Sequence, residues 1–244
     1  MSDSDDELVA RAVEHVARQP AVGGPDGVVG ALQRLCSAAV GALSASGAGV
    51  SVTAEDGVRR VTAASDPASE RIEELQFVLG EGPCIDAFAS RRPVLVPDLT
   101  DGAAHRWPAY APAVHDEGVR AVFAFPLQVG AARLGVLDVF RARAGTLTGD
   151  QLRQAFAFTD LAVRTLLDSQ DDAAPGAAAD GLDEAIEHNA ELFQAQGMVM
   201  VQLGVPLAEA LVRIRAHTYA QNRRLNDVAR DIIARRLHFD PDHS

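Results

Sequence analysis

The segment Asp171–Gly181 constrains the fold of this chain more than any other feature, because it divides the sequence into two unequal parts. It has no apolar periodicity, and small and acidic residues surround its Pro175–Gly176 pair. Such a composition is typical of a linker between folded units. The sequence therefore predicts a large first unit and a small second unit of about 60 residues.

The two predicted units carry opposite charge. Residues 1–180 contain 15 arginines against 25 acidic residues, whereas residues 192–239 contain 7 arginines against 3 acidic residues. The whole chain has a net charge of −12, which argues against a protein that coats nucleic acid non-specifically. All 22 basic residues are arginine, so any bound anion would be met by planar guanidinium groups, which can donate paired hydrogen bonds.

The sequence has no apolar run long enough to span a bilayer, and residues 1–7 are acidic where a signal peptide would be basic. We therefore expect a cytoplasmic protein that does not enter the membrane. The two cysteines, Cys36 and Cys84, are far apart and form no CxxC motif, so we predict neither a structural disulfide nor a zinc site. His105 and His115 have acidic neighbours, but their spacing fits no standard metal-ligand set.

The first part alternates helices and strands. Two long, almost continuously apolar strands are joined across Gly130, and a capping box between Thr148 and Gln151 opens the last helix. This order predicts an α+β unit whose antiparallel sheet is covered on one face by helices. The predicted helices are 8–18, 28–43, 69–78 and 148–167, and the predicted strands are 48–53, 58–64, 93–97, 119–129 and 133–140, with Asp56–Gly57 as a hairpin turn.

The second part begins with residues spaced alternately four and three apart, which is the spacing of a coiled-coil heptad seam. This spacing predicts a long helix that can pair with a second copy of the chain, giving a homodimer. The polar members of the seam would set its register, unless they are simply exposed. The seam comprises Leu182, Ile186, Asn189, Phe193, Gln196, Met200 and Leu203.

Two shorter helices follow. Gly204 is placed to end the first helix, Pro206 suits the first turn of the second, and Asn226 can cap the third. The pattern predicts a small all-α three-helix module with a coiled-coil first helix. The buried face of its second helix is predicted as Leu207, Ala210, Leu211 and Ile214, and that of its third as Leu225 or Val228, with Ala229, Ile232, Ile233 and Leu237.

Four motifs in the first part carry a resemblance to a known family: LGEGPC at 79–84, RPVLVPD at 92–98, VRAVFAFPL at 119–127 and LGVLD at 134–138. Over about residues 28–168 the chain resembles GAF domains, which are small-molecule sensors. The resemblance implies a small-molecule ligand, but no motif identifies the ligand or a cofactor, and the domain could bind none. The candidate sensor residues are Cys84, Trp107 and Tyr110.

Each of these candidates has an alternative. Cys84 follows Gly82–Pro83 at a helix start, where a thiolate is favoured, so it is either a redox sensor or an inert buried cysteine. Trp107 and Tyr110 could line a ligand pocket or anchor their loop.

The second part carries the motifs AQGMVM at 195–200, LGV at 203–205, AEA at 208–210 and NRRLNDVA at 222–229, followed by Ile232. Residues 182–239 therefore resemble ANTAR domains, the RNA-binding output modules of bacterial antitermination regulators. The resemblance implies a homodimer that binds paired RNA hairpins in mRNA leaders and so prevents termination or exposes a ribosome site. Relatives often carry lysine at a position implicated in RNA contact, where this chain has Gln196.

Arginine is the residue that pairs with phosphate and reads guanine, so the candidate RNA-binding residues are chiefly arginines of the basic cluster. Any single one of them could equally be an ordinary solvated residue. Tyr219 could stack on a base or pack against the module. The candidates are Gln196, Arg213, Tyr219, Arg223, Arg224 and Arg230.

These features predict a cytoplasmic transcription antitermination regulator without enzymatic activity. Three alternatives stay open. The helices could bind another protein and no RNA. A GAF-fold enzyme such as a methionine-sulfoxide reductase would need several cysteines close together, and a DNA-binding helix-turn-helix would need more polar residues on the third helix. The predicted layout is an acidic extension at 1–26, a GAF-like sensor at 27–170, a linker at 171–181, an ANTAR-like domain at 182–239 and a tail at 240–244.

Overall fold

The computed structural model describes the backbone of residues 3–19, 27–53, 59–171, 182–221 and 223–240, and the side chains of the same ranges except 3–6, 53, 59–62, 169–171, 182–190 and 208. The chain separates into two compact units, Met1–Leu182 and Asp183–Ser244. The predicted linker, apart from Asp171, and the predicted Asp56–Gly57 turn lie outside the described residues.

A five-stranded sheet forms the centre of the first unit, with strand order β2-β1-β5-β4-β3 and antiparallel pairing throughout. Phe123 and Phe125 of β4 point to one face, and Val122 and Ala124 point to the other, so the strand is buried on both sides. The strands are β1 (Gly47–Thr53), β2 (Arg59–Ala64), β3 (Val94–Val96), β4 (Ala121–Val129) and β5 (Ala132–Arg141).

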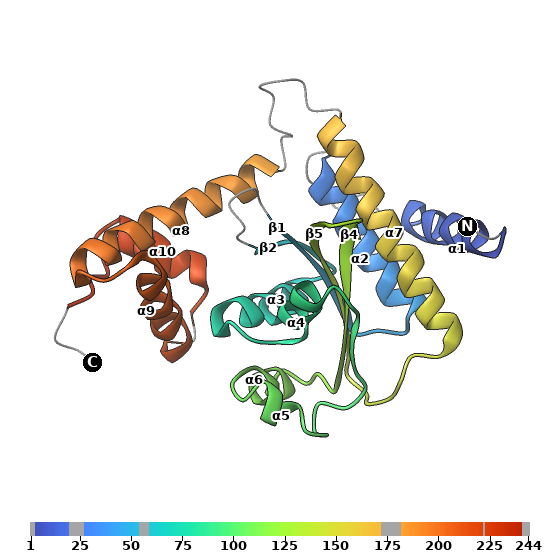
Figure 1. The fold of residues 1–244 in the computed structure, drawn as a ribbon, viewed down its shortest axis with the longest axis horizontal. Helices are drawn as coiled ribbons and strands as arrows, with labels where there is room; N and C mark the ends of the chain where they lie inside the picture. Colours follow the sequence, from blue (N-terminus) through green and yellow to red (C-terminus); the bar gives the residue numbers. More distant parts are fainter. Residues whose placement is uncertain (1–2, 20–26, 54–58, 172–181, 222, 241–244) are drawn as a thin grey trace. The chain divides into compact units, whose positions relative to one another are not determined.

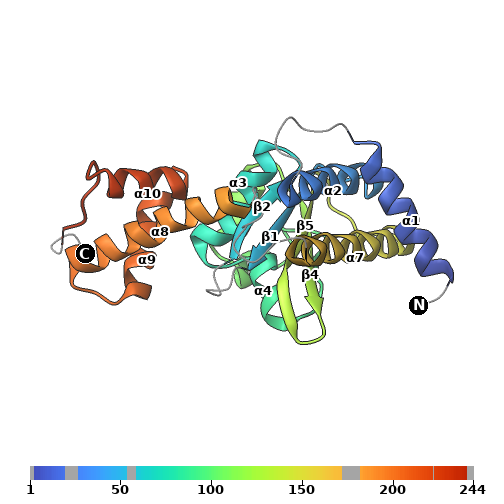
Figure 2. The same ribbon diagram turned by 90° about the horizontal axis from the view of Figure 1, so that it is seen from above.

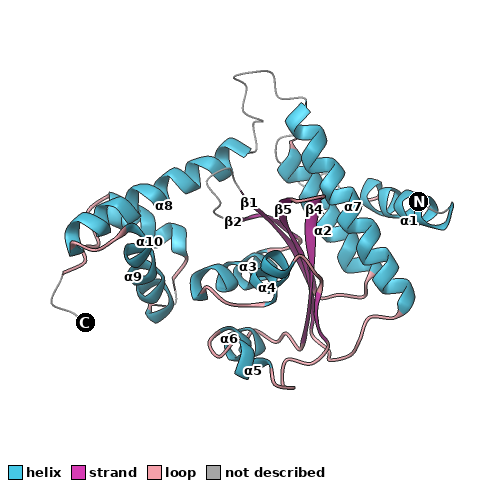
Figure 3. Cartoon of the chain, in the orientation of Figure 1, coloured by secondary structure: helices cyan, strands magenta, loops and turns pink. Residues whose placement is uncertain are grey.

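Helices cover both faces of this sheet, whereas the sequence predicted cover on one face only (Figure 1, Figure 3). The continuous apolar runs of β4 and β5 are explained by this double burial. One layer consists of α1 (Asp3–Ala17), α2 (Val28–Ala42) and α7 (Gly149–Asp171), which lie together in Figure 2. The other consists of α3 (Pro67–Leu79), α4 (Pro83–Ser90), α5 (Ala103–Arg106) and α6 (Tyr110–Asp116).

The acidic N-terminal extension contributes to the first of these layers. Helix α1 contacts α2 and α7, with Ala12 buried and Leu8, Val9 and Val16 packed against the same core. Part of the predicted extension therefore belongs to the core of the first unit.

The predicted capping box at the start of α7 is confirmed. The backbone N–H of Thr148 donates to Oε1 of Gln151 at 3.0 Å, and the backbone N–H of Gln151 donates to Oγ1 of Thr148 at 3.2 Å. These reciprocal bonds satisfy two donors that a helix start otherwise leaves unpaired.

The second unit consists of α8 (Leu182–Leu203), α9 (Leu207–Ala220) and α10 (Leu225–Ile233). Gly204 adopts a left-handed φ of 66°, as predicted for a residue that ends α8. Two predictions about the other helices are wrong. Arg224, and not Asn226, is the N-cap of α10, and Leu207 is 41% exposed because Ala210, Ile214 and Thr218 form the buried face of α9.

The α+β class of the first unit and the all-helical second unit are as the sequence predicted. None of the described helices combines the length and the apolar character needed to cross a bilayer.

Candidate functional site

The turn between α9 and α10 presents two adjacent arginines to solvent. Arg223 and Arg224 are both exposed, and the backbone N–H of Arg223 donates to the carbonyl of Thr218. Helix α10 has no side-chain cap at its start. Its first N–H groups therefore add the positive end of a helix dipole to the two guanidinium groups.

Asp231 holds two of the nearby arginines. Nη2 of Arg223 lies 2.6 Å from one oxygen of Asp231, and Nη2 of Arg236 lies 2.6 Å from the other. Hydrogen bonds from Arg223 and then Arg236 hold the pKa of Asp231 below its ordinary value. The carboxylate therefore stays ionised at neutral pH and keeps two exposed guanidinium groups close together.

The remaining arginine candidates are exposed and paired. Nε of Arg213 lies 3.0 Å from Glu209 on the same helix, and Nε of Arg230 lies 3.1 Å from Glu191 of α8. Ion pairs between exposed residues contribute little to stability, so a phosphate can replace the carboxylate partner at small cost. Tyr219 is 51% exposed on the last turn of α9, so its ring does not belong to the core of the module.

Gln196 does not lie on this surface, which corrects the sequence-based prediction. Its side chain is 6% exposed, and its Nε2 donates a 2.7 Å hydrogen bond to the carbonyl oxygen of Leu207. That carbonyl lies at the start of α9, so Gln196 joins α8 to α9. Because the amide is turned into the module, we do not include Gln196 among the proposed RNA contacts.

The predicted dimer seam is only partly described. The side chains of Leu182, Ile186 and Asn189 lie outside the described residues, Phe193 is 36% exposed, and Met200 is partly buried. The interior face of α8 is instead Leu192, Ala195, Gln196 and Val199. At about 3.6 residues per turn, Phe193 and Met200 lie roughly a quarter turn from that face.

The three candidate sensor residues all lie in the core that α3 to α6 form against the sheet. Trp107 is buried, and its Nε1 donates to Asp86 of α4 at 3.2 Å while Arg106 stacks 4.6 Å from its ring centroid. These contacts favour the interpretation of Trp107 as a loop anchor.

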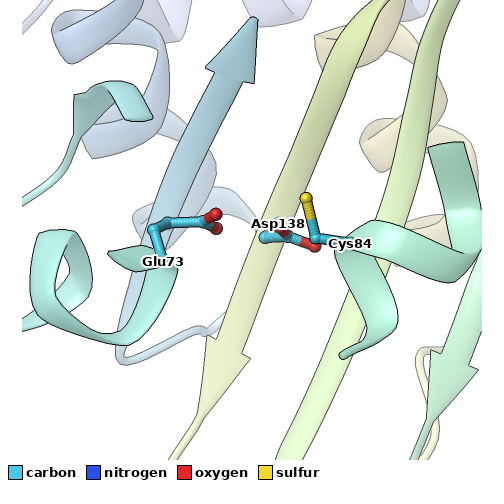
Figure 4. Close-up of side chains that lie close together, drawn as sticks. All are labelled: Glu73, Cys84 and Asp138. Carbon is cyan, nitrogen blue, oxygen red and sulfur yellow. The ribbon is translucent and has the colours of Figure 1, made fainter. Parts of the chain in front are cut away.

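Cys84 belongs to a buried polar cluster with Glu73 and Asp138 (Figure 4). Glu73 comes from α3, Cys84 from the first turn of α4 and Asp138 from the middle of β5. Their exposed fractions are 2%, 3% and 0%, and a carboxylate oxygen or the sulfur of each lies within 4.8 Å of the others. Two carboxyl groups and a thiol therefore meet where water is excluded.

Neighbouring residues fix this arrangement. Gln76, one turn after Glu73, donates from Nε2 to Asp138 at 3.2 Å and accepts from the backbone N–H of Cys84 at 2.7 Å. Ser51 Oγ lies 3.2 Å from the sulfur of Cys84. A Cβ at Gly49 would lie 2.5 Å from Cγ of Glu73, so only glycine at this point of β1 admits the glutamate.

Glu73 and Asp138 were not among the site residues predicted from the sequence. Asp138 left a signal, because it is a lone acidic residue within the apolar run of β5, where an unpaired charge is costly. Glu73 left none, because acidic residues are ordinary on the surface of a helix such as α3.

The two cysteines lie in different cores. Cys36 belongs to the core under α1, α2 and α7, and Cys84 belongs to the core under α3 to α6, so the sheet separates them. This placement does not provide the adjacent cysteines that a GAF-fold sulfoxide reductase would need. Among the described residues, the one group of three potential metal ligands is Glu73, Cys84 and Asp138, which includes neither His105 nor His115.

Comparisons with known proteins agree with this division of the chain. A family model described as the GAF domain matches residues 27–167, and one described as the ANTAR domain matches residues 180–233. Comparison with curated protein sequences gave no match.

Solved structures resemble the first unit at low sequence identity. The GAF domain of a phosphoenolpyruvate-protein phosphotransferase from Coxiella burnetii has a TM-score of 0.52 and 16% identity, covering 70% of this chain and 98% of that one. The corresponding domain from Acinetobacter has a TM-score of 0.50 and 11% identity, with the same two coverages. These identities support the fold alone. With the family matches, they show that the chain belongs to the GAF domain family and carries an ANTAR domain after its GAF domain.

Proposed function

We propose that this protein is a cytoplasmic regulator of transcription antitermination, in which the GAF domain senses a signal and a dimer of the ANTAR domain binds paired RNA hairpins. The match of residues 180–233 to the ANTAR family carries the proposal. Both families serve sensing and regulation, so we propose no catalytic role.

The surface of the ANTAR domain supports RNA as the ligand. Arg223, Arg224 and the uncapped start of α10 together offer guanidinium and backbone N–H donors to phosphate. Hairpin loops expose unstacked bases, and the exposed ring of Tyr219 offers a face on which a base can stack. Arg213 and Arg230 extend the positive surface over α9 and α10.

The proposed homodimer uses the seam face of α8. Phe193, a large apolar side chain that is more than a third exposed, lies beside the interior face and remains uncovered in the single chain. Pairing with a second α8 would bury it. Phe193→Glu should therefore yield monomers in sedimentation equilibrium, whereas Val212→Glu, at an exposed apolar position of α9, should leave the dimer intact.

The proposal is tested by selection from a pool of synthetic RNAs with one or two stem-loops and randomised loop sequences, using the full chain. We expect enrichment of two-hairpin RNAs over one-hairpin RNAs and duplex DNA, two chains per bound RNA, and an affinity that falls as salt rises. Failure to enrich any RNA at low salt would contradict the proposed function.

A second candidate is supported by the apolar side chains of Val201 and Val212, which are exposed on α8 and α9. These side chains suit a protein partner, and the domain would then regulate that partner without binding RNA. Dimerisation without RNA enrichment in the same experiment would favour this function.

A further inference from the structure

The buried cluster of Glu73, Cys84 and Asp138 brings together three side chains that can each ligate a metal ion. Each side chain is at least 97% buried, and the three come from α3, α4 and β5, which are separated in sequence. Carboxylate and thiolate groups lose their hydration when they are buried. A cation bound among two carboxylates and a thiolate would offset this loss of hydration.

Tyr110 provides a second and independent observation. Its side chain is fully buried, and its hydroxyl has no hydrogen-bond partner among the described residues. Tyr110 belongs to the same core as Cys84, and its helix α6 packs against α3, which carries Glu73. A buried hydroxyl would be expected to have a hydrogen-bond partner, and a group bound in this core could supply one.

We propose that Glu73, Cys84 and Asp138 bind a divalent transition-metal ion of the zinc type, with the hydroxyl of Tyr110 beside it. Sulfur ligation favours this class over magnesium or calcium, which prefer oxygen ligands alone. Ligand atoms about 2.0–2.3 Å from a tetrahedral ion lie about 3.3–3.8 Å apart. Groups that already lie within 4.8 Å of one another need only small side-chain rotations to reach this spacing.

The surrounding residues are placed as an outer layer of such a site. Gln76 donates to one oxygen of Asp138 and accepts from the backbone of Cys84, so one side chain orients two ligands. Ser51 is positioned to donate to the sulfur. On binding, the Cys84 thiol and any protonated carboxyl group release their protons to solvent as the bonds to the metal form.

The metal ion would be the ligand of the proposed sensor, and only this regulatory meaning rests on the proposed function. Metal binding is measured without RNA, so failure of RNA binding and failure of metal binding are separate results.

The test uses the full chain, stripped with a chelator and titrated with Co²⁺, whose bond to a thiolate gives a charge-transfer absorption in the near ultraviolet. We expect the band to saturate at one equivalent and to disappear in Cys84→Ser. Glu73→Gln and Asp138→Asn should weaken binding about tenfold or more. Cys36→Ser removes the other buried cysteine, across the sheet, and should leave the band unchanged.

X-ray absorption on zinc-loaded wild-type protein gives a result that does not depend on whether a variant folds. We expect one sulfur neighbour at about 2.3 Å and otherwise light-atom ligands. The proposal is overturned if the wild type binds no metal, if the Co²⁺ band persists in folded Cys84→Ser, or if the zinc has no sulfur neighbour.

Discussion

The double substitution Arg223→Ala with Arg224→Ala addresses the proposed RNA surface directly. Both side chains are exposed, and Asp231 keeps Arg236 as a partner when Arg223 is removed. We therefore expect the fold of the ANTAR domain to survive. The expected effect falls on RNA affinity, because two guanidinium groups beside the start of α10 are lost.

The magnitude follows from counterion release. Each phosphate contact contributes about 0.7–0.9 to the slope of log affinity against log salt, so losing two contacts lowers the slope by about 1.5. With equal affinities taken at 1 M salt, this difference in slope makes the variant bind RNA about 17-fold more weakly than wild type at 0.15 M salt. If either arginine also reads a guanine edge, the loss grows by a further ~1–3 kcal/mol.

Fluorescence anisotropy with a selected two-hairpin RNA, measured across a salt series, checks this expectation. The matched control is Arg11→Ala with Arg18→Ala, which removes two exposed, ion-paired arginines from α1 and the turn that follows it. The control should bind within about twofold of wild type with the same slope. The reasoning is refuted if the Arg223 and Arg224 variant keeps wild-type affinity at 0.15 M salt, or if the control loses as much.

Three further predictions concern the folded state and are checked by chemical denaturation of the full chain. Asp66 caps α3, and although burial opposes its ionisation, hydrogen bonds from Ser65, Ser69 and backbone N–H groups outweigh burial and lower the pKa of Asp66. Asp66→Ala should lower the free energy of unfolding by about 1–2 kcal/mol at pH 7, and Asp66→Asn by less. The difference from wild type should shrink as the pH falls below 3.8, where the carboxylate of the folded protein becomes protonated. Gly135→Ala should destabilise the fold by about 1–3 kcal/mol, because the added Cβ would lie 2.0 Å from the carbonyl oxygen of Ser51 in β1. Gly41→Ala is the control and should not destabilise, because a Cβ at Gly41 meets nothing within 4 Å. Gln196→Ala should cost the ANTAR domain about 1–3 kcal/mol, because it removes a buried side chain together with the hydrogen bond from its Nε2 to the carbonyl oxygen of Leu207. An unchanged unfolding midpoint would argue against this structural role.

Burial on both faces explains why the sheet was predicted better than its surroundings. The two long strands and the Thr148 capping box are local patterns, set by continuous apolar runs and by side chains three residues apart. Whether helices cover one face of the sheet or both depends on which face α3 to α6 pack against. The sequence of these helices does not specify that face, and the only sign of it was the continuous apolar character of the long strands such as β4.

The same distinction holds on α8. A spacing of four and three residues identifies a helix with an apolar stripe, and it includes Gln196 in that stripe. Which of two neighbouring faces turns inward is decided by α9 and α10, which bury Leu192, Ala195 and Val199 and leave Phe193 at the edge. Gln196 is inward because a carbonyl of α9 accepts its hydrogen bond.

By itself, the sequence determined the division into two units, the strand and helix order, and the arginines beside α10, because composition, periodicity and turn chemistry act over a few residues. Only the tertiary structure decided that Glu73, Cys84 and Asp138 meet. Gln76 and Asp138, which hold that cluster together, are 62 positions apart. Their contact depends on the register of β5 against β1 and on the packing of α3 over the sheet, and no short-range pattern specifies either.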